Sequence, residues 1–436
     1  MSISALSGPA SLLPAESNPL LLDQFLAPLQ PLFAGYLRGI RTGSVLNDVT
    51  FAHRGIQRVL SQSVSGRDFL QHLAEVHDTP LARSTFFDAL QSGRREQLLG
   101  NLNSELVRFN TSSLPDLLGA FPALANCPVY AVDGHHVAHA VHANRHPDGD
   151  HVTANNLYLL GLHDGLLQNI GAVQGGGKRR HEMPVLREQI LEWLLRQGPG
   201  RGPVPILVLD PAFIDNAFWI RMAMTSASRL RFVTRLKKNM KPMVLQVRTW
   251  DLNDTINQGV QTDEKVSFNG RDPMRLIRYL DPETGYLYEF LTTVMDLPPG
   301  LVAFLYLMRW RIEKVFDTSK NKLQEKKSWA TGSVAQNIQT HLIALTHNLL
   351  VIFREKLRRD HGIQEVKIER KRQKAIEVRR EAAVKVGRLL PSFHDLVPTV
   401  IQLSAQYIRV LRNGILTSRR WLDSLRSFRR AMEIYL

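Results

Sequence analysis

The segment from Pro128 to Leu236 most restricts the possible fold, because strand-like and helix-like runs alternate along it. Two strand-like runs, "PVYAVDGHHVAHAVH" and "NNLYLLGLHDGLLQNIGAV", come first, and the second contains a hairpin turn at Asp164-Gly165. An amphipathic helix ("MPVLREQILEWLLRQ"), a strand ("VPILVLD"), a helix from about Ile214 and a strand ("LRFVTRL") follow. This order predicts a mixed α/β sheet with helices packed on it.

Changes in composition on both sides of this segment divide the chain into five parts. Turn signals at Asn269-Gly270 and at Asp281 to Gly285 mark a polar, strand-rich insertion in the α/β unit. The predicted parts are a helical N-terminal region (1–125), the first part of the α/β unit (126–240), a β-rich insertion (241–299), the last part of the α/β unit with the helix that carries Glu313 (300–355), and a basic helical C-terminal region (356–436).

Within the first part, "SGRDFLQHLAEVHDTPLARSTFFDALQSGRREQLL" predicts two short helices around a turn at His77 to Pro80. The second helix would begin near Ser84 and present Ser84 and Thr85, with Arg94 and Arg95 at its far end. This spacing fits a helix-turn-helix motif that reads DNA. An ordinary pair of packed helices explains it equally well, since the motif has no strict sequence signature.

The charge of the chain indicates its partner. The net charge is +15, and residues 354–388 hold 13 Lys and Arg against 6 Asp and Glu. Such an excess favours nucleic acid. The sequence contains no apolar run of the roughly 18 residues that a membrane span needs, and its start lacks the basic region of a secretory signal. A single cysteine, Cys127, excludes an intrachain disulfide and fits a reducing cytoplasm.

Three carboxylates stand where catalytic groups are expected. Asp133 lies within the apolar strand "YAVDGHHV", Asp210 closes "PILVLD", and Glu313 lies on a helix after the insertion. Three oxygen ligands without a thiolate suit Mg²⁺ or Mn²⁺. Two such ions can stabilise both the attacking and the leaving oxygen of a phosphoryl transfer. Each acid taken alone is more simply a capping or salt-bridged residue.

The helix that carries Glu313 also places other groups on one stripe. Tyr306, Arg309, Glu313 and Lys320 stand at offsets of three, seven and fourteen residues, so they fall within an arc of roughly 60° on one continuous helix. The alternative interpretation is a solvated charged face with pairing between neighbouring turns.

These residues carry a resemblance to a known family. Tyr306-x2-Arg309-x3-Glu313-x6-Lys320 matches the Y-R-E-K signature of the insertion-sequence-4 family of bacterial DDE transposases. The segments "AVDG", "VLD", "FLTT", "RW" and "FVTRLKKN" are similar as well, and the resemblance covers about residues 125–350. One departure is the Pro-Ala-Phe sequence after Asp210, where many relatives have Arg-Gly-Phe. Asp215 is the alternative second acid.

The resemblance implies a ribonuclease-H-like core in which the third acid follows a β-strand insertion, so residues 126–240 and 300–355 are the expected catalytic core. Residues 1–125 are then the expected DNA-binding domain, and residues 356–436 the expected region for dimerisation or DNA contact. The resemblance also implies that Asp133, Asp210 and Glu313 are catalytic and hold two Mg²⁺ ions, with Mn²⁺ able to substitute. The implied protein is a transposase of the bacterial cytoplasm, associated with the nucleoid. It would cleave the ends of its element and join the 3′-OH ends to target DNA. The family's example includes a hairpin intermediate after the first cut. The protein would act as a homodimer on double-stranded DNA, without a membrane partner.

Several further side chains are candidate DNA contacts. Lys178, Arg179 and Arg180 lie in the glycine loop "QGGGKRRHE", which lacks P-loop spacing and is otherwise a surface hairpin. The candidates are Ser84, Thr85, Lys178, Arg179, Arg180, Arg235, Lys237, Tyr306, Arg309, Trp310 and Lys320. A metal site of histidines is disfavoured, because His135 and His139 would face one side of a strand while His136 and His142 face the other.

Two other functions fit the same residues. One is a transposase-derived DNA-binding protein that does not cut, and the other is a ribonuclease-H-like nuclease without strand transfer. The helical tail from about residue 330 contains apolar runs such as "LIALTHNLLVIF". These runs predict a surface that pairs two protomers, and the alternative is that they cover the catalytic sheet.

Overall fold

A computed structural model of the protein describes residues 18–36, 46–61, 63, 65–77, 81–137, 155–173, 182–196, 203–224, 230–270, 272–323, 328–391, 393, 395 and 403–433. Within these ranges, none of the helices combines the length and the apolar character needed to cross a lipid bilayer.

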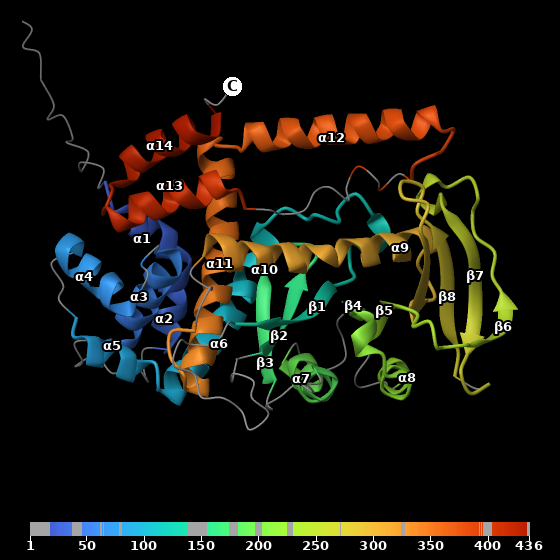
Figure 1. Cartoon of the computed structure of the whole chain (residues 1–436), viewed down its shortest axis with the longest axis horizontal. Helices are drawn as coiled ribbons and strands as arrows, with labels where there is room; N and C mark the ends of the chain where they lie inside the picture. The colour runs from blue at the N-terminus through green and yellow to red at the C-terminus, as the bar shows by residue number, and fades with distance from the viewer. Residues whose placement is uncertain are drawn as a thin grey trace, which may run out of the picture.

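One mixed sheet forms the centre of the molecule, with the strand order β3-β2-β1-β4-β5-β9-β8-β7-β6 (Figure 1). Its first five strands are β1 (Val129–His136), β2 (Asn155–Gly161), β3 (Leu167–Val173), β4 (Ile206–Leu209) and β5 (Arg231–Arg235). Among these five, β2 alone runs against the others, because β1, β4 and β5 pair in parallel and β2 pairs antiparallel with both β1 and β3. This is the arrangement of a ribonuclease-H-like core, so the predicted fold class is confirmed.

The predicted insertion extends the same sheet. Its strands are β6 (Met243–Val247), β7 (Val260–Ser267), β8 (Met274–Leu280) and β9 (Leu287–Thr292), which form an antiparallel meander that joins the core where β9 pairs with β5. The expected turns occur where Gly165, Gly270 and Gly285 adopt positive φ angles between 70° and 77°. Glycine adopts this left-handed conformation without the steric cost that a side chain adds.

Helices cover both faces of the sheet (Figure 1). On one face, α7 (Glu182–Arg196) and α8 (Asn216–Met224) pack through Leu186, Ile190 and Trp219 on inward side chains such as Val132. On the other face, α9 (Pro299–Met308) and α10 (Trp310–Lys322) pack on side chains such as Ala131. Neighbouring residues of β1 therefore point to different helix layers, as strand geometry requires.

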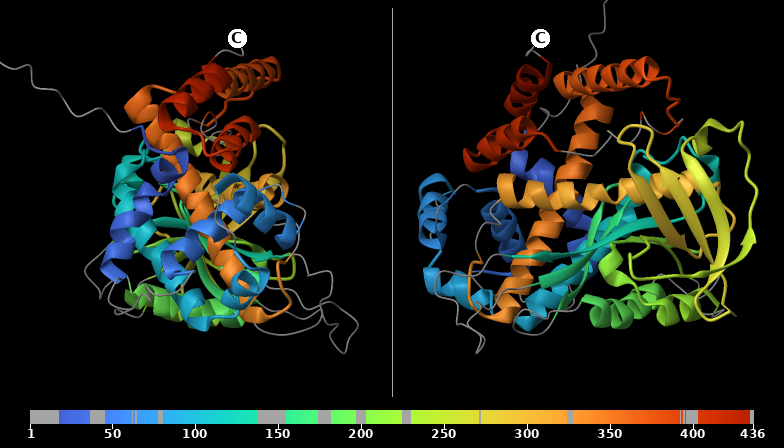
Figure 2. Two further views of the ribbon diagram at one scale, coloured as in Figure 1. Left: turned by 90° about the vertical axis from the view of Figure 1, so that its left-hand side faces the viewer. Right: turned by 45° about the vertical axis from the view of Figure 1, so that its right-hand side comes forward.

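The N-terminal helices share one apolar core with the C-terminal helices. They are α1 (Leu21–Leu26), α2 (Gln30–Tyr36), α3 (Asp48–Leu60), α4 (Gly66–His77), α5 (Arg83–Ala89) and α6 (Gly93–Asn110). Three of them, α1, α3 and α6, pack against α11 (Ser333–His361), which lies between the N-terminal helices and the sheet (Figures 1 and 2). The packing between α3 and α11 is close, because a Cβ at Gly55 would lie 2.5 Å from Leu342 Cδ1.

This shared core contradicts the expectation that the apolar run of the tail forms a surface for pairing two protomers. The apolar run from Leu342 to Phe353 is buried inside the chain, against the N-terminal helices and the sheet. Tyr407 and Ile408 of α13 (Ala405–Leu416) join the same core, as does Phe428 of α14 (Trp421–Glu433). These residues therefore offer no free apolar surface for a second protomer.

The predicted positions of Arg94 and Arg95 are also wrong. The helix that carries Ser84 and Thr85, α5, ends at Ala89, and both arginines begin the next helix, α6. There they bind the buried carboxylate of Asp48, with Arg94 Nη1 at 2.6 Å and Arg95 Nε at 3.0 Å. Their role in the described structure is to tie α6 to α3.

The basic helix α12 (Val366–Lys385) lies along the outside of the molecule and reaches from α11 to the insertion (Figure 1). Arg379 forms an ion pair with Glu283 at 3.1 Å, and Arg388 donates to the carbonyl of Pro282 at 2.9 Å. Both partners lie in the turn between β8 and β9. Only two residues of α12, Ile376 and Ala383, are buried, so most of this helix faces solvent.

Candidate active site

Asp133 lies in the second half of β1, opposite Tyr158 of β2. Its Oδ1 accepts a hydrogen bond from the backbone N–H of Gly134 at 2.9 Å. Burial raises the pKa of Asp133 to about 6, although the positive charge of Arg309 works in the opposite direction. A carboxylate in this environment is stabilised by additional positive charge.

Asp210 follows β4 and caps the short 3₁₀ turn formed by the Pro-Ala-Phe sequence, where its Oδ1 accepts from the N–H of Ala212 at 2.9 Å. Strands β1 and β4 are parallel neighbours, and Val132 is in register with Leu209. The next residue of each strand is Asp133 or Asp210, so the two aspartates lie at the same edge of the sheet. The Pro-Ala-Phe sequence after Asp210 therefore does not move this carboxylate away from the edge of the sheet where Asp133 lies.

Arg309 joins the two aspartates to the third acid. Its side chain is only 6% exposed, and its Nη2 donates to Glu313 Oε1 at 2.8 Å. The same guanidinium lies 3.4 Å from Asp133 Oδ2 and 3.8 Å from Asp210 Oδ2. β1, β4 and α10 thus bring the three predicted acids together around one cation.

The predicted single helix is divided at Arg309. Its backbone keeps helical angles (φ −54°, ψ −34°), but its N–H bonds to the carbonyl of Tyr306, three residues back, instead of four. Ile312 does the same with Arg309. This tighter turn separates α9 from α10, which lie end to end across the sheet (Figure 1).

The other side chains of the stripe differ in exposure. Tyr306 is 3% exposed, and its ring packs on Phe290 with centroids 5.0 Å apart. Burial raises the pKa of Tyr306, and the charges of Arg309 and Arg235 partly offset this effect. Lys320 is exposed, and so is Trp310, which follows Arg309 but lies outside the stripe and is 54% exposed.

Arg235 is the last residue of β5, and Lys237 comes two residues later. Both lie at the edge of the sheet where the parallel strands β1 and β4 also end. The Arg235 guanidinium lies 5.8 Å from the ring centroid of Tyr286 and 5.6 Å from that of Tyr288. Both tyrosines belong to the insertion, and Tyr286 is about half exposed. Cations and aromatic rings therefore extend from the acids toward β9.

Several predicted residues lie elsewhere. Ser84 is exposed and Thr85 is half-buried on α5, within the N-terminal helices. Lys178, Arg179 and Arg180 lie outside the described residues. The alternative acid, Asp215, forms an ion pair with Arg187 and caps α8.

The histidine-rich strand shows no metal-binding arrangement in its described part. The ring of His135 is buried and stacks on Phe316, with centroids 4.2 Å apart and an angle of 10° between the planes. His139, His142 and His146 lie outside the described residues.

One acid near this site was missed. Glu182 begins α7, and its Oε1 accepts a hydrogen bond from Asn155 Nδ2 at 3.3 Å. Burial raises the pKa of Glu182, and repulsion from Asp210 adds to the increase. The only signal for it in the sequence is an acid in the first turn of a helix, which is common.

The donor set of this site fits a divalent cation. Asp133, Asp210 and Glu313 supply oxygen donors only, which Mg²⁺ prefers. One arginine faces three carboxylates, so the site has excess negative charge when they are ionised. In the described part of the chain, no three His, Cys, Asp or Glu side chains already stand at metal-binding spacing.

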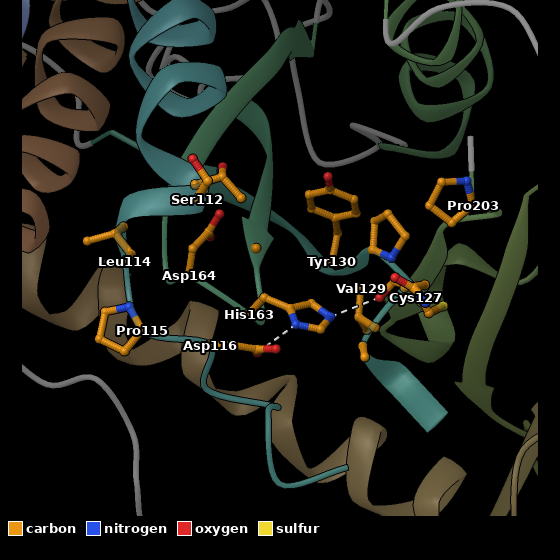
Figure 3. Close-up of a pocket in the computed structure, with 15 residues that line it drawn as sticks. Ser112, Leu114, Pro115, Asp116, Cys127, Val129, Tyr130, His163, Asp164 and Pro203 are labelled. Carbon is orange, nitrogen blue, oxygen red and sulfur yellow. Dashed lines mark hydrogen bonds and ion pairs between the residues drawn. The ribbon is translucent and has the colours of Figure 1, made fainter. Parts of the chain in front are cut away.

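A separate cavity of about 460 Å³ lies at the other end of the strands (Figure 3). Its lining includes Val129 at the start of β1 and Pro203 just before β4. Within it, hydrogen bonds join His163 Nδ1 to Asp116 at 2.7 Å and His163 Nε2 to the Cys127 carbonyl at 2.8 Å. Both ring nitrogens are engaged, so this histidine holds the loops together.

The fold and the site define a protein with a ribonuclease-H-like sheet and a carboxylate centre at the ends of β1 and β4. The chain matches the family described as "Transposase DDE domain" over residues 128–349, just over half of its length. It therefore belongs to this family of DNA transposition enzymes, which generally use divalent metal ions.

A solved transposase structure is also similar to this chain. It is described as the cryo-EM structure of the piggyBac transposase synaptic complex with hairpin DNA, and the match has a TM-score of 0.40 and 10% sequence identity. The match covers 92% of this chain and 82% of that chain. None of the curated proteins matches the chain in sequence.

Proposed function

We propose that this protein is the transposase of a bacterial insertion sequence of the insertion-sequence-4 family. It cleaves the ends of its element and joins the freed 3′-OH ends to target DNA. The observation that supports this most is the convergence of Asp133, Asp210 and Glu313 around Arg309, within the segment that matches the transposase family.

The three acids would hold two Mg²⁺ ions, with Mn²⁺ able to substitute. Bound there, the ions supply Lewis-acid stabilisation of the phosphoryl group and an activated oxygen nucleophile. Arg309 and Lys320 contribute positive charge for phosphate, and arginine can bind a phosphate through two hydrogen bonds. The exposed ring of Trp310 can stack on a base at the DNA end. Arg235 and Lys237 extend this surface along the sheet edge.

The test of this function is cleavage of the element's own ends. Purified protein is incubated with labelled DNA that spans an element end and its flank, with Mg²⁺ or with EDTA. We expect a nick at the element boundary that leaves a 3′-OH, only with the metal. Specific binding without any nick would favour the non-cutting alternative.

We expect α5 to read the sequence of the ends. Ser84→Ala with Thr85→Ala should reduce the preference for end DNA over random DNA by about 5- to 10-fold, because side chains at base edges carry sequence information. Competition binding at fixed salt measures this preference. Ser104→Ala, an exposed serine on α6, is the matched control.

Point substitutions suit this test better than deletion of residues 1–125. The N-terminal helices share a core with α11, so their removal would expose residues such as Leu342. An unchanged preference in the double variant would mean that the element ends are read elsewhere.

We propose that two protomers pair on two DNA ends through the C-terminal region. The apolar core of the tail is used internally, whereas most of α12 is exposed, so we assign the pairing surface to α12. Val378 and Val384 of α12 are 57% and 75% exposed. Replacing both with Asp should reduce the complex of two proteins and two ends at least about fivefold, because charge opposes burial of the helix in an interface. Sedimentation with end DNA measures this, and a normal amount of complex would exclude α12 from the interface.

A further inference from the structure

Glu182 reaches the catalytic strand from the face opposite to Glu313. Its carboxylate accepts a hydrogen bond from Asn155, the first residue of β2. Asn155 is 1% exposed and in register with His136 of β1, so its position is fixed by the sheet. Glu182 is thereby held against the end of β1.

The space that Glu182 occupies exists because the residue after Asp133 is glycine. A Cβ at Gly134 would lie 1.8 Å from Glu182 Oε1 and 2.4 Å from its Cδ. The carboxylate therefore fills the place of a side chain at position 134. Because neighbouring strand residues point to opposite faces, Glu182 approaches from the α7 side while Arg309 and Glu313 approach from the α10 side.

We propose that Glu182 is a fourth carboxylate of the catalytic centre and helps to hold the divalent cations with Asp133 and Asp210. This inference rests on the proposed function. A buried asparagine on one side and a glycine on the other place this carboxylate next to an expected metal ligand. Its oxygens are the donors that Mg²⁺ and Mn²⁺ prefer.

A purely structural role makes a different prediction. An acid in the first turn of a helix interacts favourably with the helix dipole, which is worth about 0.3–1 kcal/mol. On that basis Glu182 would stabilise α7 and have no effect on metal binding. Metal affinity measured without DNA therefore separates the two roles.

The experiment measures Mn²⁺ binding to the full chain by electron paramagnetic resonance, without DNA. Glu182→Gln is expected to weaken Mn²⁺ binding by about 10- to 100-fold, the range seen when groups around a metal are altered. Glu188→Gln, an exposed acid on the same helix, is the matched control and should bind as the wild type does. Asp133→Asn should also weaken binding.

A second variant, Gly134→Ala, tests the Glu182 carboxylate while leaving Glu182 itself unchanged. Gly134→Ala places a methyl group where Glu182 Oε1 lies, so it should also weaken Mn²⁺ binding. Combined with Glu182→Gln, it should add little further loss, because both changes remove the same interaction. Gly93→Ala is the control, since a Cβ at Gly93 would meet nothing within 4 Å.

The outcomes separate the two proposals. If Asp133→Asn weakens Mn²⁺ binding and Glu182→Gln binds as the wild type does, Glu182 is a structural residue and this inference is overturned. If neither variant weakens binding, the metal site of the proposed function is itself wrong. Weakened binding in both, with an unchanged Glu188→Gln control, supports the fourth carboxylate.

Discussion

Asp133→Asn, Asp210→Asn and Glu313→Gln are each expected to reduce nicking of the element end by at least about a thousandfold, which corresponds to roughly 4 kcal/mol of transition-state stabilisation. Each change removes a negative charge but keeps the size of the side chain. An asparagine in place of either aspartate can still accept the backbone hydrogen bond that Gly134 donates to Asp133 or that Ala212 donates to Asp210. Metal ligation, by contrast, depends on the charge.

Binding of end DNA should remain within about twofold of the wild type in these variants, because phosphate affinity comes mainly from Lys and Arg. Nicking is measured on labelled end DNA, and binding is measured in parallel by gel shift. Asp215→Asn is the matched control: it changes an acid five residues from Asp210 that caps α8 and pairs with Arg187. Full cleavage by any one of the three variants would remove that residue from the site.

Arg309→Ala is expected to have the second largest effect, because its guanidinium is shared by three carboxylates. Removing one partner of a fully buried ion pair costs about 3–5 kcal/mol. Here the side chains of the acids are 23–41% exposed, so solvent screening lowers the expected loss of unfolding free energy to about 1–3 kcal/mol. Chemical denaturation without metal measures this loss.

Adding Mg²⁺ should restore more stability to Arg309→Ala than to the wild type, since a cation can replace the lost positive charge among the acids. In the cleavage assay, Arg309→Ala and Lys320→Ala should slow the steps after the first nick more than the nick itself, because both would position the terminal phosphate. If the stripe is only a solvated charged face, each variant should lose about 0.3–0.5 kcal/mol of unfolding free energy and should cleave and join DNA as the wild type does. Near wild-type strand transfer by both variants would favour that interpretation.

The sequence predicted most of the sheet because its signals are local. Alternating apolar runs defined the strands, and turns such as Asn269-Gly270 formed where glycine takes a positive φ. The acids could be found for the same reason: Asp133 interrupts an apolar strand, and Asp210 ends one. Parallel pairing of β1 and β4 then brings their carboxylates to one edge.

The errors concern contacts between residues far apart in the chain. Arg94 and Arg95 were expected at the far end of the helix that begins near Ser84, but they begin the next helix, and Asp48, more than 40 residues earlier, binds both. The apolar run of α11 was expected to pair two protomers or to cover the catalytic sheet, and neither interpretation included the N-terminal helices that cover it, because they are distant in sequence. Glu182 was missed for a related reason, since its proximity to Asp133 depends on the space left by Gly134.

The division of the helix at Arg309 also depends on three-dimensional context. Periodicity alone predicted one continuous helix from Tyr306 to Lys320, and the helical backbone angles at Arg309 agree with it. The hydrogen bonds nevertheless tighten where the arginine turns toward the carboxylates at the strand ends. Such a local adjustment has no signature in the pattern of apolar residues.

The most direct test of the proposed transposase is joining of a cut end to target DNA. A labelled element end with an exposed 3′-OH is incubated with supercoiled plasmid, Mg²⁺ and either the wild type or Asp133→Asn. We predict a covalent end–plasmid product with the wild type, and none with Asp133→Asn or with EDTA. Cleavage or binding of the end by the wild type without any joined product would contradict the proposed transposase function.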